Sequence, residues 1–317
     1  MTNDKKQFDF GKVALLMGGT SAERDISLLS GEAIYQALLE HNIDVVKIDP
    51  KDDFIKEFEI NKIDRAFIAL HGTNGEDGTI QGFLTMMKIP FTGSDIVSSA
   101  ISMNKIISKR IWQQAGLNTT RFFEVSADDN FTLERANDVR QVLGKTHFVK
   151  PASEGSSVGM SKTTSAEQLV QAVAKAQKYG NVLIEQFVDG REYTVGIVGG
   201  KALPSISMVT PNEYYDYDAK YCADTTEYFC PSGLSDLEEQ QLQSTAVAAF
   251  EMLGCSGWGR VDFILEKKTN TFNLLEANTI PGMTKTSLLP KAAKAIGMSF
   301  SQLVMNILST SLVIGEK

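Results

Sequence analysis

Short apolar runs alternate with helical stretches through the first third of the chain, and this alternation restricts the fold more than any other feature. The branched, aliphatic run Val13–Met17 stops at Gly18-Gly19, and a helical pattern follows from about Ser27 to His41. Two more apolar runs, IDVVKID and RAFIALHG, come after it. Strands that alternate with helices in this way are typical of a parallel sheet covered by helices. We therefore predict a parallel α/β unit at the N-terminus.

The pattern changes in the rest of the chain. We predict one helix around 96–115, closed by Gly116, and place a domain boundary near residue 100. From His147 onward strands such as FVKPA, VLIEQFV, GRVDFIL and FNLLEAN mix with helices predicted at about 165–179, 235–253 and 298–312. The expected fold is a parallel α/β domain over residues 1–100, followed by two α+β subdomains over 101–188 and 189–317.

Composition excludes several classes of protein. With 43% hydrophobic and 22% charged residues, the 317-residue chain has enough apolar surface for a large core. A net charge of −8 argues against an extended surface for nucleic acid, which requires clustered Lys and Arg. Three cysteines without CxxC spacing indicate neither a disulfide framework nor a thiolate zinc site. No window approaches the ~18 apolar residues of a membrane span, so we expect a cytoplasmic protein that binds no membrane.

Four polar residues stand on two predicted strands near the C-terminus. Arg260 and Asp262 are two positions apart on the first strand, and Glu276 and Asn278 are two apart on the second. Because side chains alternate along a strand, each pair lies on one face. Carboxylate and amide oxygens of this kind suit Mg²⁺, with phosphate oxygens completing the shell. The alternative is an exposed sheet face on which the carboxylates simply pair with Arg260.

A Gly/Ser-rich loop and two single lysines indicate a phosphate site. The loop EGSSVGM (154–160) follows Lys150 at the end of a strand, and its small residues allow backbone N–H groups to approach phosphate closely. It lacks the Lys-Ser/Thr ending of a P-loop. Lys105 and Lys150 stand in apolar surroundings, where each could meet an anion as a point charge. A flexible surface turn and two solvated lysines are the alternative reading.

The order of these segments resembles the ATP-grasp ligases, which hold ATP between two α+β subdomains. Within them the chain is similar to the D-alanine–D-alanine ligase family over nearly its whole length. The resemblance rests on six segments in the same order: MGGTSAERDISLLSG (17–31), LHGTNGEDGTIQGF (70–83), IPFTGSD (89–95), FVKPASEGSSVGMSK (148–162), YDYDAKY (215–221) and LLEANTIPGMTKTSLLP (274–290). It implies that ATP phosphorylates a first D-alanine and that the amine of a second attacks the acyl phosphate.

The resemblance also implies roles for residues around the two D-alanines. Glu23 would hold the ammonium of the first D-alanine, His71 would lie near it with Glu76 as its orienter, and Ser156 and Tyr221 would position Glu23 and close a loop over the site. Arg260 and the backbone N–H of Gly282 would stabilise the oxyanion, a role that suits the guanidinium fork. Ser287 and Leu288 would bind the carboxylate of the second D-alanine.

For the nucleotide, the resemblance assigns Lys105, Lys150, Ser157 and Lys220 to the phosphates. It assigns Glu185 and the backbone of Phe187 and Val188 to adenine, and Glu192 to ribose. Asp262, Glu276 and Asn278 would hold two Mg²⁺ ions, or Mn²⁺, with Glu276 bridging. The family also suggests a homodimer formed through the N-terminal domain.

The chain departs from the family pattern at three places, and other functions stay open. Asn104 stands where Asp is common, Phe187 replaces a frequent Trp, and Lys285-Thr286 replaces a frequent Ser-His beside the second-substrate residues. One alternative is a ligase with D-lactate or another acceptor. A second is an ATP-binding protein that has lost catalysis, and a third is a Rossmann oxidoreductase, which Gly18-Gly19 without GxGxxG argues against.

Overall fold

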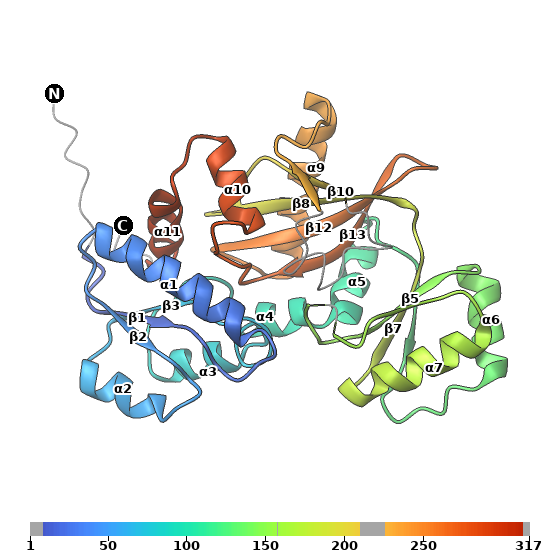
Figure 1. Ribbon diagram of the computed structural model, residues 1–317, viewed down its shortest axis with the longest axis horizontal. Coiled ribbons are helices and arrows are strands. Elements are labelled where there is room, and N and C mark those ends of the chain that lie inside the picture. Colours follow the sequence, from blue (N-terminus) through green and yellow to red (C-terminus); the bar gives the residue numbers. More distant parts are fainter. Residues whose placement is uncertain (1–8, 157, 210–225, 313–317) are drawn as a thin grey trace.

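Three β-sheets make up the computed structural model, which describes residues 9–156, 158–209 and 226–312. Figure 1 shows them as an N-terminal unit on the left, a large sheet at the centre and a smaller sheet on the right. The division into three sheets agrees with the predicted α/β and α+β organisation. The predicted boundary near residue 100 falls inside helix α4 (Ile96–Met103).

The N-terminal sheet is parallel, with strand order β2-β1-β3, as the alternating pattern predicts. Its strands are β1 (Val13–Leu16), β2 (Val45–Ile48) and β3 (Arg65–Ile68), and its helices are α1 (Arg24–Glu40), α2 (Phe54–Asn61) and α3 (Thr79–Met86). Strands β1 and β3 are completely buried, which is usual for strands of a parallel sheet. Helix α1 begins three residues before the predicted Ser27, so its first turn starts directly after Glu23.

The single helix predicted around 96–115 is wrong, because two helices occupy this stretch. Helix α4 ends at Met103, and α5 (Lys105–Gln114) begins two residues later. Asn104 between them has an extended backbone, and its side chain accepts hydrogen bonds from the N–H groups of Ile106 and Ile107. An N-cap of this kind starts a new helix and stops the preceding one. The break places Lys105 at the first position of α5.

The smaller sheet is antiparallel and has the order β4-β7-β5-β6. It consists of β4 (Phe122–Val125), β5 (His147–Pro151), β6 (Ser161–Thr163) and β7 (Val182–Gln186), with α6 (Leu133–Leu143), α7 (Ala166–Ala176) and the 3₁₀ turn Gln177–Tyr179. Apolar residues of α6 and α7 pack against β5 and β7 in one core. The predicted helix 165–179 is therefore an α-helix that ends in a 3₁₀ turn.

The large sheet carries the strands with the four polar residues. Its order is β11-β10-β8-β12-β13, with β9 paired to β8. The elements are β8 (Gly190–Val198), β9 (Lys201–Ala202), β10 (Ile206–Val209), β11 (Glu227–Phe229), β12 (Trp258–Glu266), β13 (Thr271–Asn278) and α9 (Asp236–Met252). Leu242, Ala246 and Phe250 of α9 pack against Val261 and Phe263, which covers one face of the sheet and leaves the other for function.

The last two helices connect the C-terminal sheet to the N-terminal unit. They are α10 (Leu288–Ala295) and α11 (Phe300–Ser309). Leu303, Val304 and Ile307 of α11 belong to the same buried cluster as β1 and α1 of the N-terminal unit, and Figure 1 shows α11 beside α1. One continuous core thus joins residues from both ends of the chain and fixes the N-terminal unit relative to the large sheet.

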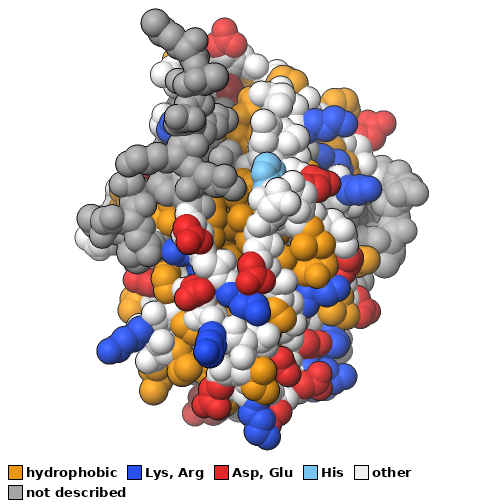
Figure 2. Space-filling view, turned by 90° about the vertical axis from the view of Figure 1, so that its left-hand side faces the viewer, with side chains coloured by type: hydrophobic (Ala, Val, Ile, Leu, Met, Phe, Trp, Pro, Cys, Tyr) orange, Lys and Arg blue, Asp and Glu red, His pale blue; other side chains and the backbone are white. Residues whose placement is uncertain are grey.

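The distribution of charge on the surface, the apolarity of the helices and the state of the cysteines follow from the described residues. Figure 2 shows acidic and basic side chains interspersed on the face that it views, with apolar patches between them. No helix in the described part of the chain has the length and apolarity needed to cross a membrane. The two described cysteines, Cys230 and Cys255, are free thiols.

Candidate active site

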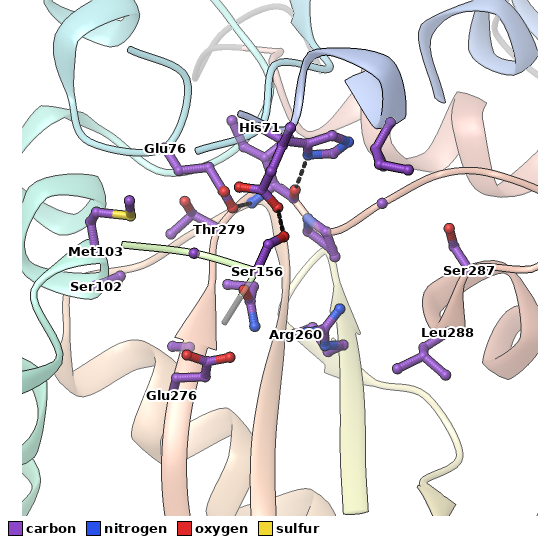
Figure 3. Close-up of a pocket in the computed structure, with 18 of the residues that line it drawn as sticks. His71, Glu76, Ser102, Met103, Ser156, Arg260, Glu276, Thr279, Ser287 and Leu288 are labelled. Carbon is purple, nitrogen blue, oxygen red and sulfur yellow. Dashed lines mark hydrogen bonds between the residues drawn. The ribbon is translucent and has the colours of Figure 1, made fainter. Parts of the chain in front are cut away.

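Two cavities meet at the uncovered face of the large sheet. The first, of about 120 Å³, lies between the N-terminal unit and the large sheet, and the second, of about 110 Å³, lies between the large and the smaller sheet. They share four lining residues, Lys105, Gly155, Ser156 and Glu276. Figure 3 shows His71 and Glu76 at one end of the first cavity and Arg260 and Glu276 toward the other, with Ser156 between. A ligand in one cavity therefore lies next to a ligand in the other.

Glu23 presents its carboxylate to the first cavity from the residue directly before α1. The hydroxyl of Ser156 donates a hydrogen bond to Glu23 Oε1. The backbone of Ser156 has a φ of 48°, which is strained for a residue with a side chain. Two glycines border the same carboxylate, since a Cβ on Gly72 or Gly155 would lie 2.7 or 2.8 Å from Glu23 Oε2. Gly72 also has a φ of +67°. The surroundings leave room for a small cationic group at Glu23.

His71 fastens the N-terminal unit to the loop after β13. Its Nδ1 lies 2.9 Å from the carbonyl oxygen of Ile280, so Nδ1 carries the proton and donates it. Its Nε2, 3.2 Å from the hydroxyl of Ser30, then accepts. Burial lowers the pKa of His71 despite the nearby charge of Glu23, so the imidazole is neutral. The ring touches the cavity while both its nitrogens are occupied, which indicates a positioning role rather than proton transfer.

Glu76 does not orient His71, contrary to the prediction from the sequence. Its two carboxylate oxygens instead accept the backbone N–H groups of Gly72, at 2.8 Å, and Ile280, at 3.2 Å. His71 thus binds the carbonyl of Ile280 and Glu76 binds its N–H, so both side chains fix the same loop. Burial and the neighbouring charge of Glu23 outweigh these hydrogen bonds and raise the pKa of Glu76 to about 8.

The raised pKa of Glu76 predicts a pH-dependent stability. The pKa of Glu76 in the folded state lies above its unfolded value of 4.5. Its contribution to folding stability is therefore fully present below pH 4.5 and is lost as the pH rises toward 8. The side chain of Glu76→Gln cannot ionise. Its free energy of unfolding should therefore rise relative to that of wild type between about pH 5 and about pH 8, by at most roughly 4 kcal/mol. Thermal melts at both pH values measure this, with exposed Glu59→Gln as the control. A constant difference between Glu76→Gln and wild type would contradict the assignment.

The strand register brings the four polar residues of β12 and β13 onto one face, as their spacing predicts. Asp262 lies opposite Glu276, and Arg260 lies opposite Asn278. Arg260 donates two hydrogen bonds to the carboxylate of Asp262, each of 2.8 Å. Asp262 also accepts from Thr194 Oγ1 at 2.6 Å and from Asn278 Nδ2 at 3.1 Å. The alternative reading expected Arg260 to pair with Asp262, and this ion pair is present. The face is not simply exposed to solvent, however, because Arg260, Glu276 and Asn278 line the first cavity.

The chemistry of this group fits Mg²⁺ bound together with a phosphate ligand. Among the described residues, no three His, Cys, Asp or Glu side chains gather closely enough to hold a metal without other donors. Two carboxylates and one amide are hard oxygen donors, and Mg²⁺ usually takes its remaining ligands from water and phosphate. Glu276 Oε2 lies 3.4 Å from Lys105 Nζ and lines both cavities, so it borders the place where phosphate would enter.

The opposite wall of the first cavity is a helix N-terminus. Ser287 is the N-cap of α10, and Leu288 is the first residue of that helix. The hydroxyl of Ser287 accepts from the N–H of Thr284 at 3.0 Å, and a Cβ on Gly282 would lie 3.1 Å from it. Free N–H groups and the dipole of a helix start favour an anion there. Gly282, Ser287 and Leu288 form one corner of the cavity that Arg260 also lines, and this corner suits an anion.

The second cavity contains a buried group of charges. Glu185 on β7 lies 2.5 Å from Lys150 Nζ and 2.6 Å from Lys109 Nζ, and it accepts from Thr120 Oγ1 at 2.5 Å. Burial alone would raise the pKa of Glu185, but the two lysine charges outweigh it and hold this pKa well below its usual range. Lys105 and Lys150 are only 11% and 20% exposed, so the reading as solvated lysines is wrong.

Besides Lys105, Lys150 and Glu185, two further predicted nucleotide residues line the same cavity, and Phe187 is not among its lining residues. Val188 and Glu192 are lining residues. Phe187 packs instead on Phe148, with ring centroids 5.8 Å apart, and its N–H donates to the carbonyl of Thr146 at 3.1 Å. The N–H of Phe187 is thus already used within the fold. Ser157, Lys220 and Tyr221 lie outside the described residues.

Several residues of the site were not predicted from the sequence. Lys109 and Thr120 surround Glu185, Thr194 supports Asp262, and Ser30 and Ile280 fix His71. Lys109 had a usable signal, since it follows Lys105 by four positions and so lies on the same face of a helix. The others carry no local signal, because their roles depend on distant strands.

Comparisons with known proteins give the family. Residues 111–309 match the family model described as D-ala D-ala ligase C-terminus, and residues 49–94 match D-ala D-ala ligase N-terminus. The D-alanine–D-alanine ligase of Pseudoalteromonas atlantica is 48% identical over 303 residues, which cover 95% of each chain. Among solved structures, the D-alanine–D-alanine ligase of Bacillus anthracis complexed with ATP is 31% identical, with a TM-score of 0.82 over 95% of this chain and 97% of that one. The VanG D-Ala:D-Ser ligase of Enterococcus faecalis is 27% identical, with a TM-score of 0.81 over 95% of this chain and 99% of that one. The chain belongs to the D-alanine–D-alanine ligase family of ATP-grasp enzymes.

Proposed function

We propose that the protein joins two D-alanine molecules at the expense of ATP, through a D-alanyl phosphate, and releases ADP and phosphate together with the dipeptide used in peptidoglycan synthesis. The observation that carries the proposal is the shared wall of the two cavities at Lys105, Gly155, Ser156 and Glu276. Phosphoryl transfer requires the terminal phosphate and the accepting carboxylate to lie in contact. A nucleotide in the second cavity and an amino acid in the first meet at this wall.

In this proposal the first D-alanine binds at the end of the cavity that holds Glu23. The Glu23 carboxylate, oriented by Ser156, would pair with its ammonium. Its carboxylate would then point toward Glu276 and Arg260 at the other end, where the phosphoryl group arrives. His71 and Glu76 fix the loop around Ile280 and so hold the width of this part of the cavity.

The second D-alanine would place its carboxylate in the corner formed by Ser287 and Leu288. Its amine then faces the acyl phosphate, and the tetrahedral intermediate develops negative charge beside Arg260 and the N–H of Gly282. Donors fixed before the reaction stabilise such charge without reorganisation, which is the main source of rate in acyl transfer. Because D-alanine arrives with a protonated amine, attack also requires the loss of one proton.

Nucleotide binding is assigned to residues around the second cavity. Lys105 and Lys150 would bind phosphates with Ser157 and Lys220, Glu185 and the backbone at Phe187–Val188 would bind adenine, and Glu192 would bind ribose. Asp262, Glu276 and Asn278 would hold two Mg²⁺ ions, or Mn²⁺, with Glu276 bridging. When bound, these ions would neutralise charge on the transferring phosphoryl group.

Two further properties are part of the proposal. We infer a homodimer formed through the N-terminal unit, where Ile60, Met86 and Val97 are large, exposed apolar side chains on three successive helices. Sedimentation at several concentrations checks this, and a monomer throughout would contradict it. We place the reaction in the cytoplasm, where ATP is available.

The test of the function is phosphate release from ATP with D-alanine, L-alanine and D-lactate compared, and with the product identified by mass. We expect release with D-alanine alone, and dipeptide as the product. Release that requires D-lactate as the second substrate would establish the alternative acceptor. No release with any substrate, although ATP binds, would establish a catalytically silent protein.

A further inference from the structure

Lys109 is a completely buried cation that the proposed reaction does not use. Its side chain is 0% exposed, and it is absent from the residues that line the two cavities of the described site. Its Nζ lies 2.6 Å from Glu185 Oε1, 2.6 Å from Thr119 Oγ1, 2.9 Å from Thr120 Oγ1 and 3.3 Å from the carbonyl oxygen of Leu274. The ammonium group thus lies behind Glu185, outside the lining of the cavity that Glu185 borders.

A buried lysine needs a compensating partner, and here the partner is a residue that faces the nucleotide cavity. Taking an ammonium group out of water costs several kcal/mol unless an anion and hydrogen bonds replace the water. Burial lowers the pKa of Lys109, and the attraction of Glu185 opposes this. Conversely, a buried Glu185 without cations would take up a proton. The charge states of the two groups depend on each other.

The contacts that Glu185 makes with other described residues leave it one acceptor position. An ionised carboxylate offers about four lone-pair sites and no donor. Oε1 is filled by Lys109 and Thr120, while Oε2 accepts from Lys150 and keeps one site beside the cavity that Glu185 lines. That site can receive the exocyclic amine of adenine. It repels the carbonyl oxygen that a 6-oxopurine presents at the same place.

Lys150 cannot keep Glu185 ionised by itself when nucleotide is bound. Lys150 lines the cavity and is one of the proposed phosphate ligands, so a phosphate competes with Glu185 for its ammonium group. Lys109 has no such competitor, because it lies behind Glu185. During binding Lys109 is therefore the cation that stays with the carboxylate.

We propose that Lys109 is a positioning residue for base selection, which keeps Glu185 an acceptor so that the site takes a 6-aminopurine nucleotide and rejects a 6-oxopurine nucleotide. The inference rests on the proposed function in one respect, since it takes Glu185 as the contact to the base. Without Lys109, Glu185 becomes protonated and presents an O–H donor, which suits a 6-oxo group. Selection by hydrogen-bond type is strong, because a mismatched pair leaves buried polar groups unsatisfied.

The test compares ATP with ITP, which differ at the base in the 6-position group. We expect wild type to prefer ATP, and Lys109→Met to lower the ATP/ITP ratio of kcat/KM by about tenfold or more. The change should come from a higher KM for ATP with little change in kcat, since Lys109 lines neither of the two described cavities and so does not touch the transferring phosphate. Lys175→Met, which removes an exposed lysine of the same subdomain that does not contact Glu185, should keep the wild-type ratio.

A double-mutant cycle with Glu185→Gln separates base selection from folding. Glutamine carries both a donor and an acceptor, so Glu185→Gln should lower the ratio in the same direction. Lys109→Met added to it should change the ratio no further, because the carboxylate on which Lys109 acts is gone. If Lys109→Met alone does not fold, Lys109→Gln, which keeps hydrogen-bonding groups but carries no charge, replaces it and should lower the ratio in the same direction.

Two results would overturn the proposal. An ATP/ITP ratio that is unchanged in Lys109→Met but lowered in Glu185→Gln would leave Lys109 a structural residue. A ratio unchanged in both would remove Glu185 from base recognition. Calorimetry without D-alanine gives the ratio of the ATP and ITP affinities, which does not depend on turnover. Failure of the proposed function would appear differently, as a wild-type protein that binds ATP but forms no dipeptide.

Discussion

Glu276→Gln should abolish detectable turnover while the protein melts within a few degrees of wild type. Glu276 lines both cavities and is the proposed bridge between two Mg²⁺ ions. The amide has the same shape as the carboxylate, so no cavity is created, but one anionic ligand is lost and both ions are held more weakly. Phosphate release over a Mg²⁺ titration measures the activity, and a thermal melt reports the fold.

The control for this variant lies at the far end of the paired strand. Glu266→Gln alters a carboxylate of β12 that lines neither of the two cavities and accepts a hydrogen bond from Thr269 at 2.7 Å. It should turn over like wild type. A second readout is the gain in ATP affinity on adding Mg²⁺, which should shrink in Glu276→Gln and persist in Glu266→Gln. Wild-type turnover by Glu276→Gln would remove Glu276 from the metal site.

Elements with a strong local signal could be predicted from the sequence. The parallel N-terminal sheet follows from alternating apolar runs, and α9 was predicted to within one residue at each end. The helix break at Asn104 was missed because the apolar spacing continues across it, while the capping side chain that causes it is a single polar residue. Helix α10 was missed as well, since Pro290 in its first turn resembles a turn signal although proline is tolerated there.

The residues of the site also divide into those with a local signal in the sequence and those without one. The same-face arrangement of Arg260, Asp262 and Glu276 follows from period two along each strand and is confirmed by the register. Membership of the D-alanine–D-alanine ligase family is confirmed by the comparisons. The partner of Glu76 could not be predicted, because Ile280 lies 204 positions away in the sequence. The domain limits at 100 and 188 and the individual site roles stay predictions.

The depth of burial is the property that sequence reasoning could least supply. Lys105, Lys109 and Lys150 are all lysines in apolar surroundings, yet only Lys109 is completely enclosed. Which of them contacts a ligand and which supports another side chain depends on the packing of α5 between two sheets. Local composition is the same for both outcomes.

Arg260→Lys should lower kcat about a hundredfold or more, with a much smaller change in the KM for ATP. Arg260 holds Asp262 with two of its guanidinium nitrogens and lines the cavity in which the oxyanion is proposed to form. Lysine keeps the positive charge beside Asp262, so the protein should still fold. It lacks the planar fork, however, and a single ammonium cannot hold Asp262 and also donate to an oxyanion in fixed geometry. Loss of one such donor typically costs 10²–10³ in kcat.

Arg135→Lys is the matched control, because Arg135 on α6 forms an ion pair with Asp129 at 2.7 Å and lines neither of the two described cavities. It should leave both kcat and KM near their wild-type values. Steady-state kinetics with D-alanine and ATP varied in turn separate the two parameters. A hundredfold loss that appeared in the KM for D-alanine rather than in kcat would assign Arg260 to substrate binding. Because an interaction made only in the transition state lowers kcat and kcat/KM together, that outcome would remove Arg260 from the proposed oxyanion site.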